Sequence, residues 1–212
     1  GLRVARDELE GWGGATPAVL EATERVADAL GAATTITLPA VGLARAAAIV
    51  ITAAEGADQQ EELLRARPEL VDPRVRDRFL AGLDVPAIDY LAAQRFRRHW
   101  QQQVLPLLAG VDVLVLPTVA CAAPVIDQPT IEIDGQTLPT GAVLGRFTQP
   151  LSFIGLPALS VPLAGPDGLP LGVQLAGRPY GDGALLAAAA ALEAAGTIAA
   201  VSPDRDRAEA WT

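Results

Sequence analysis

Lysine and methionine are absent from this chain of 212 residues, and cysteine and histidine occur once each. Without lysine, these residues cannot form a catalytic serine–lysine pair. Cys121 has no second cysteine for an internal disulfide, and Cys121 and His99 together are too few ligands for a structural zinc site. We therefore expect no metal ion in this chain.

Positive charge is also scarce. The 16 arginines are outnumbered by 25 acidic residues, and the net charge is −9, whereas a nucleic-acid-binding surface needs an excess of positive charge. No apolar run approaches the length of a transmembrane helix, and no signal-peptide pattern opens the chain. Half of the residues are hydrophobic, which favours a folded chain. We expect a soluble, cytoplasmic protein that binds neither nucleic acid nor a membrane.

The first 38 residues predict a strand–helix–strand unit. A short strand over 2–6 leads into a glycine-containing loop, and a helix follows over 17–30. Thr16 is a typical N-cap residue for this helix, and Gly31 is typical of its end. The β-branched residues of 34–38 predict the second strand. Such a unit favours parallel strand pairing and an α/β fold.

Helical and strand patterns alternate along the rest of the chain. The segment 112–117 is apolar at successive positions, as in a strand buried on both faces. Asp134-Gly135 predicts the turn of a hairpin over 131–138. Helices are also predicted over 41–55, 61–67, 73–80, 87–108 and 182–193, and strands over 158–162 and 171–176, joined by a turn over 165–168. We expect an α/β fold, a single unit over 1–212 with a mixed, mostly parallel sheet flanked by helices.

Nucleophiles are few and lie outside known catalytic patterns. None of the three serines lies in a Gly-x-Ser-x-Gly elbow. Cys121, between alanines, is more typical of a small hydrophobic residue. His99 lies on a predicted helix beside Trp100, which favours a surface or subunit-contact position over a catalytic one. No glycine-rich phosphate-binding pattern follows any strand, and we expect no cofactor.

Arg95, Arg97 and Arg98 form a local basic cluster on the predicted helix over 87–108. Such a cluster is typical of a solvated or interface helix face. An anion site is the alternative.

Four segments resemble the C-terminal part of the amidase signature family, in the family's order and with its spacing: 2–5, 112–118, 147–162 and 168–177. Within the third segment, Gly155 and Pro157 predict a tight turn ahead of a buried strand over 158–161. Within the fourth, the side-chain amide of Gln174 is placed to bond with loop backbone. Most of these residues are expected to build the scaffold.

Three further segments are similar to one branch of this family, the branch of 1-carboxybiuret hydrolases and related amide hydrolases. They are Thr52–Gly56, Asp72–Arg78 and Ala93–Arg98, with Leu64–Pro68 after the first of them as part of the same likeness. The branch is related to the A subunits of tRNA-dependent amidotransferases.

The resemblance implies hydrolysis of an amide bond in a small amide or urea-type substrate. Enzymes of the family use a lysine and two serines that lie upstream of the position matching Gly1, and this chain has no lysine. The chain is therefore expected to be the C-terminal half of the fold, without catalytic residues, and to supply one wall of the substrate pocket. The residues expected on that wall are Thr148, Gln149, Pro117, Thr118, Arg146 and Phe153.

Arg146 has two interpretations. The amidotransferase A subunits carry, three residues before the position of Thr148, an aspartate that binds the amino group of glutamine, and this chain has Gly145 there. The difference argues against a substrate that is recognised by the amino group of glutamine. Arg146 would instead suit a substrate carboxylate. An ordinary surface arginine is the alternative.

Two other functions are open at this point. The chain could be a non-catalytic binding or assembly module that pairs with another subunit, or a relic without activity. An exposed apolar strand edge would favour association, and we expect a homodimer or a partner subunit.

Overall fold

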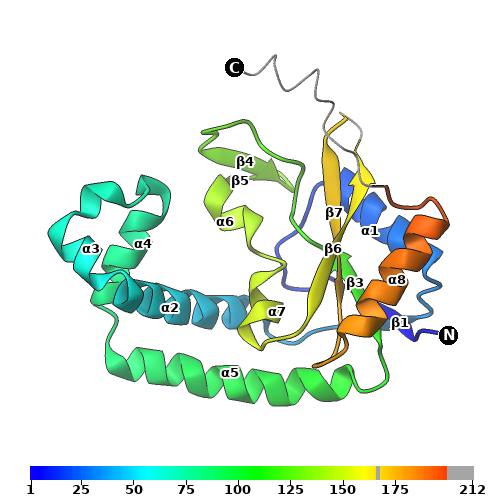
Figure 1. The fold of residues 1–212 in the computed structure, drawn as a ribbon, viewed down its shortest axis with the longest axis horizontal. Coiled ribbons are helices and arrows are strands. Elements are labelled where there is room, and N and C mark those ends of the chain that lie inside the picture. Colours follow the sequence, from blue (N-terminus) through cyan, green and yellow to red (C-terminus); the bar gives the residue numbers. More distant parts are fainter. Residues whose placement is uncertain (166–167, 200–212) are drawn as a thin grey trace.

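The computed structural model describes residues 1–165 and 168–199 (Figure 1). The strands are β1 (Val4–Asp7), β2 (Thr34–Ile36), β3 (Val113–Pro117), β4 (Thr130–Ile133), β5 (Gln136–Pro139), β6 (Ala158–Ala164) and β7 (Pro170–Ala176). The helices are α1 (Pro17–Ala29), α2 (Val41–Gln59), α3 (Glu61–Ala66), η1 (Pro68–Leu70), α4 (Pro73–Leu83), α5 (Ala87–Leu107), α6 (Thr140–Leu144), α7 (Gln149–Phe153) and α8 (Asp182–Ala194). Part of the turn predicted over 165–168 lies outside the described residues.

Five strands form the main sheet, in the order β2-β1-β3-β7-β6. β1 pairs in parallel with β2 and β3, whereas β7 pairs antiparallel with β3 and β6. β7 alone among the five therefore runs against the others, and the predicted mixed, mostly parallel sheet is confirmed. β3 lies at the centre and all five of its residues are buried, as its apolar sequence predicted.

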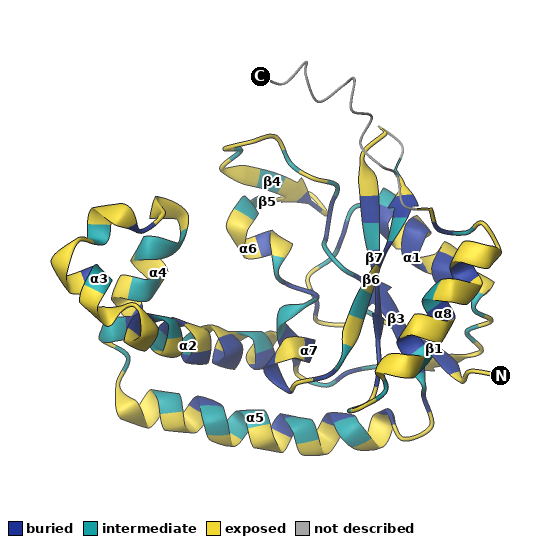
Figure 2. Ribbon diagram, viewed as in Figure 1, coloured by how far each residue is buried: buried dark blue, intermediate teal, exposed yellow. Residues whose placement is uncertain are grey.

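Helices cover both faces of the sheet. Figure 1 shows α1 and α8 on one side, and α7 with α2 and α5 on the other. α2 and α4 extend away from the sheet and enclose a small second cluster around Ala57, Leu64 and Val71. In Figure 2 the buried residues follow β3 and the inner sides of the helices. Among the described helices, none has both the length and the apolar character needed to cross a bilayer.

Two local expectations differ from the structure. Thr16 precedes α1 as predicted, but its side chain makes no capping hydrogen bond; its backbone N–H donates to the Ala120 carbonyl at 2.8 Å. The strand predicted to be buried over 158–161 is instead half exposed, and only Val161 of it is buried. The reason is its position, because β6 pairs only with β7 and forms one edge of the described sheet.

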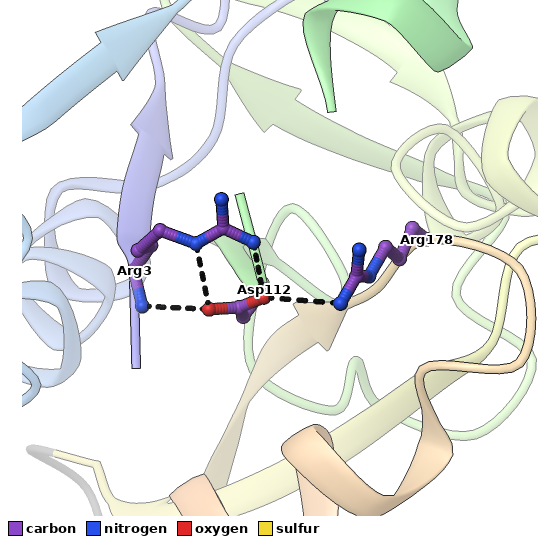
Figure 3. A network of polar contacts seen from close by, with 3 residues as sticks. All are labelled: Arg3, Asp112 and Arg178. Atoms are coloured by element: carbon purple, nitrogen blue, oxygen red, sulfur yellow. Dashed lines mark hydrogen bonds and ion pairs between the residues drawn. The ribbon is translucent and has the colours of Figure 1, made fainter. Parts of the chain in front are cut away.

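An ionic cluster joins the start of β1 to the start of β3. Asp112 accepts hydrogen bonds from the backbone N and Nε of Arg3, both at 3.0 Å, and from its Nη2 at 2.8 Å. Figure 3 shows Arg178, which follows β7, on the other side of the carboxylate, with its Nη2 at 3.5 Å. The bonds from Arg3 hold the pKa of Asp112 well below its usual range. The cluster ties together three neighbouring strands.

We predict that Asp112→Asn lowers the melting temperature, because Arg3 and Arg178 lose their shared carboxylate. The pKa of Asp112 is depressed in the folded state, so its contribution is present at neutral pH and is lost as the pH falls below about 4. Thermal unfolding between pH 2 and 8 measures the difference between the variant and the wild type. Asp58→Asn, an exposed position on α2, is the matched control. A constant difference at all pH values would contradict the ionic explanation.

Candidate functional site

The loops that follow β1 and β3 meet at the carboxyl end of the parallel strands. The bond from Thr16 N to the Ala120 carbonyl joins them directly. In sheets of this kind, ligands bind where such loops meet. The candidate site is therefore built outward from this edge.

Thr118, directly after β3, forms a hydroxyl pair with Ser160 of β6. The two oxygen atoms are 2.7 Å apart, and both lie over Gly172 of β7. A Cβ atom at Gly172 would lie 3.0 Å from the Ser160 hydroxyl and 3.1 Å from the Thr118 hydroxyl, so glycine leaves the space that the pair occupies. Pro117, the last residue of β3, is buried. Sequence reasoning named Thr118 but missed Ser160, because only the register of β6 and β7 brings the two together.

Gln174 of β7 fixes the segment that carries most of the predicted site residues. Its buried side-chain amide donates to the Phe147 carbonyl at 3.2 Å, which confirms the predicted bond to loop backbone. The Phe147 ring is fully buried and stacks on Trp12 at 5.4 Å between centroids. Thr148 follows at the start of α7, with its hydroxyl 3.5 Å from the Gly145 carbonyl.

Arg146 is buried, with only 6% of its surface exposed. Its Nη1 donates to the carbonyls of Gly13 and Gly14, in the loop after β1, and its Nε has no partner among the described residues. Burial, with a smaller contribution from Arg45, lowers its pKa. The interpretation of Arg146 as an ordinary surface residue is therefore wrong, since the side chain holds a loop of the candidate site.

Gln149 and Phe153 line a cavity of about 150 Å³ between α2, α5 and α7. The other residues around it are Ala48, Ile51, Thr52, Glu55, Arg97 and Ser152. The structure thus brings Gln149 and Phe153 together. Thr118 lies apart from them, over Gly172 of β7, and the same strand holds the Phe147 carbonyl through Gln174. Arg146 points to the loop after β1.

Asp7, at the end of β1, is a buried carboxyl group that sequence reasoning missed. Its Oδ1 accepts from Leu9 N at 2.7 Å and from Trp12 Nε1 at 2.9 Å, whereas Oδ2 has no partner among the described residues. Burial raises the pKa of Asp7 to about 6. Through Trp12, this carboxyl group supports the ring of Phe147. A charged residue ending a buried strand was the available signal.

Cys121 and His99 lie as their sequence contexts predicted. Cys121 is buried, and burial raises the pKa of its thiol, as for a small hydrophobic residue. His99 is exposed on α5, beside Phe96. Within residues 1–165 and 168–199, no three His, Cys, Asp or Glu side chains gather as metal ligands would.

We predict that the fluorescence of Trp12 changes with pH, with a midpoint near 6, because the charge of its partner Asp7 changes there. The folded-state pKa is raised, so the contribution of Asp7 to stability is full at low pH and falls as the pH rises through about 6. The transition should vanish in Asp7→Asn and in Trp12→Phe. It should persist in His99→Gln, which removes the imidazole next to Trp100 in the chain. A transition that follows His99 would refute the assignment.

Three comparisons place the chain among known proteins. The amidase family model matches residues 1–186. The protein AtzE of Pseudomonas sp. (strain ADP), a 1-carboxybiuret hydrolase subunit, is 38% identical over 200 residues, which cover 92% of this chain and 43% of that protein. The A subunit of the glutamyl-tRNA(Gln) amidotransferase from Parvibaculum lavamentivorans is 34% identical, over 74% of this chain and 31% of its own length.

A solved structure has the same fold over nearly all of this chain. It is described as an unexpected vestigial protein complex that reveals the evolutionary origins of an s-triazine catabolic enzyme, and it superposes with a TM-score of 0.89 at 37% identity. The match covers 95% of this chain and 44% of that one. The chain thus spans less than half the length of each of these relatives. Its family model, its sequence and its fold agree, and the chain belongs to the amidase family.

Proposed function

We propose that this chain is part of an amidase that hydrolyses the amide bond of a small amide or urea-type substrate, and that it supplies one wall of the substrate pocket. The observation that carries the proposal is the cavity beside Gln149 and Phe153, because these residues lie in a segment within the family match. The Ser-Ser-Lys set is proposed to come from outside these 212 residues, as the resemblance implies.

The wall offers the groups that amide hydrolysis needs for orientation. In the reaction, a serine oxygen loses its proton and attacks the carbonyl carbon, the C–N bond breaks, and ammonia or an amine leaves with that proton. Water then hydrolyses the acyl-serine ester, which releases the acid and restores the serine. In the proposal, the Thr118 hydroxyl, Thr148 and the Gln149 amide hydrogen-bond the substrate, Phe153 supplies apolar surface, and the buried Pro117 supports the position of Thr118. Holding the carbonyl at a fixed place is what raises the rate of attack.

A partner subunit or a second copy is also part of the proposal. The AtzE relative is named as a subunit, and the solved relative is described as a complex. The relatives do not favour the alternative of a non-catalytic assembly module, because AtzE is named a hydrolase subunit. The cytoplasmic location stays a prediction.

The proposal predicts that the full-length protein that contains these 212 residues releases ammonia or an amine from small amides. Thr118→Val and Gln149→Ala should each raise KM by about two- to ten-fold, the effect of losing one ordinary hydrogen bond. Gln102→Ala, at an exposed position on α5, is the control and should leave KM unchanged. Absence of hydrolysis across short amides, ureas and biuret-like compounds would refute the function. Unchanged KM values in both variants would refute the proposal that Thr118 and Gln149 line the substrate pocket.

The carboxylate role of Arg146 stays a proposal with its own test. Nη1 is occupied by backbone carbonyls, so a substrate carboxylate would have to bind the remaining edge of the guanidinium group. If it does, Arg146→Ala raises KM for acidic amides more than for neutral amides. Equal changes for both substrate classes, with a lower melting temperature, would leave Arg146 as a loop anchor alone.

A further inference from the structure

Helix α5 has one side packed against the protein and the opposite side exposed. The buried residues of the packed side are Ala93, Trp100 and Val104. Figure 2 shows α5 at one border of the molecule, with exposed residues along its outer side. The exposed residues that follow one another there at helical spacing are Ile88, Leu91, Arg95 and Arg98. We call these four residues the outer face of α5.

The outer face is apolar near the start of α5. Ile88 is 70% exposed and Leu91 is 53% exposed, on adjacent turns of the helix. Exposed alanines, Ala87 and Ala92, lie beside them. Single exposed apolar side chains are common in folded proteins, but here they share one stripe of a helix. Such a stripe with charged residues beside it is typical of a surface that binds another protein.

Unpaired charges of both signs lie next to this apolar stripe. Arg95 and Arg98 follow it along α5, and Asp84 and Asp89 lie at the start of the helix. Within residues 1–165 and 168–199, these four side chains form no ion pair. Asp58 of α2 adds a carboxylate in a hollow at the start of α5. The outer face is therefore basic toward one end and acidic toward the other.

We propose that the outer face of α5 binds the same face of a second copy of this chain, with the two helices antiparallel about a two-fold axis near Leu91. The basic half of each helix then lies over the acidic start of the other. Counting residues from the axis places Arg98 level with Asp84 of the second copy, and Arg95 within one turn of its Asp89. The inference rests on the part of the proposed function that expects a partner subunit or a second copy.

A second copy suits this face because the face complements itself. A two-fold interface uses one patch on both copies, so that patch must carry both halves of each contact. A uniformly acidic partner would be attracted by Arg95 and Arg98 but repelled by Asp84 and Asp89, and a basic partner would meet the reverse. Two copies with a net charge of −9 repel each other at long range. Association therefore depends on local pairs of opposite charge.

The full-length protein is tested by sedimentation equilibrium between about 1 and 100 μM, because one pair of helices makes a small interface and a weak dimer. The wild type should reach the mass of two copies at the upper end of this range. Arg98→Asp should raise the dissociation constant by about ten-fold or more, because carboxylates then face each other. Arg25→Asp, at an exposed position on α1, is the matched control and should leave the dissociation constant unchanged.

Asp84→Arg should weaken the dimer in the same way, and the double variant with Arg98→Asp should restore the wild-type dissociation constant. Within one copy the two positions cannot pair, because the helix from Ala87 to Arg98 alone spans about 17 Å. Restoration therefore reports a contact between copies. If circular dichroism shows that Arg98→Asp does not fold, Arg95→Asp with Asp89→Arg replaces the first pair.

The mass of one copy at every concentration would overturn the inference. A dimer that Arg98→Asp leaves unchanged, or that the double variant does not restore, would overturn it as well. These outcomes are separate from the proposed function, which is decided by hydrolysis of amides. A monomer that hydrolyses amides keeps the function and loses this interface, whereas a restored dimer without activity keeps the interface and loses the function.

Discussion

A buried hydrogen bond from the Gln174 amide to the Phe147 carbonyl fixes the position of the candidate site. Phe147 lies between a sheet and a loop, where its carbonyl cannot reach water, and an unpaired carbonyl there would cost about 1–3 kcal/mol. The bond attaches the backbone of Phe147, the residue before Thr148, to β7. α7 then starts at a set point, and Gln149 and Phe153 face α2 and α5. The geometry of the cavity beside Gln149 and Phe153 therefore depends on one strand residue.

The charged groups of the core also act through polar contacts to one loop. Asp7 and Arg146 are both buried without an opposite charge as a direct partner, and each stabilises the loop between β1 and α1 instead: Asp7 through Trp12, Arg146 through the carbonyls of Gly13 and Gly14. Burying such groups costs free energy. Their shifted pKa values reflect that cost. What the fold gains is a loop held at the carboxyl end of β1, where ligands bind in sheets of this kind.

Short-range patterns in the sequence predicted most of the fold. The strand–helix–strand start, the doubly buried β3 and the hairpin at Asp134-Gly135 all follow from short-range chemistry, and both turn residues have the positive φ that such a turn needs. The site was less predictable. The two residues of the Thr118–Ser160 pair lie 42 positions apart in the chain. The exposure of β6 likewise depends on which strands flank it. Periodicity shows that a helix has a polar side, but not which other helix faces that side.

Arg97 and Arg146 show how far sequence reasoning reaches. Arg97 lies in a segment that the family resemblance singled out, and Arg146 directly precedes another. The sequence left a carboxylate-binding role and a surface position both open for Arg146, and for Arg97 it favoured a solvated or interface helix face over an anion site. Packing separates them: Arg146 is turned into the protein, where backbone carbonyls take its donors, whereas Arg97 rests on Phe153 beside a cavity and keeps its donors. The charge and the donor geometry of the two side chains are the same. A role in recognition therefore depends on which donors the fold leaves unused, and that follows from tertiary contacts alone.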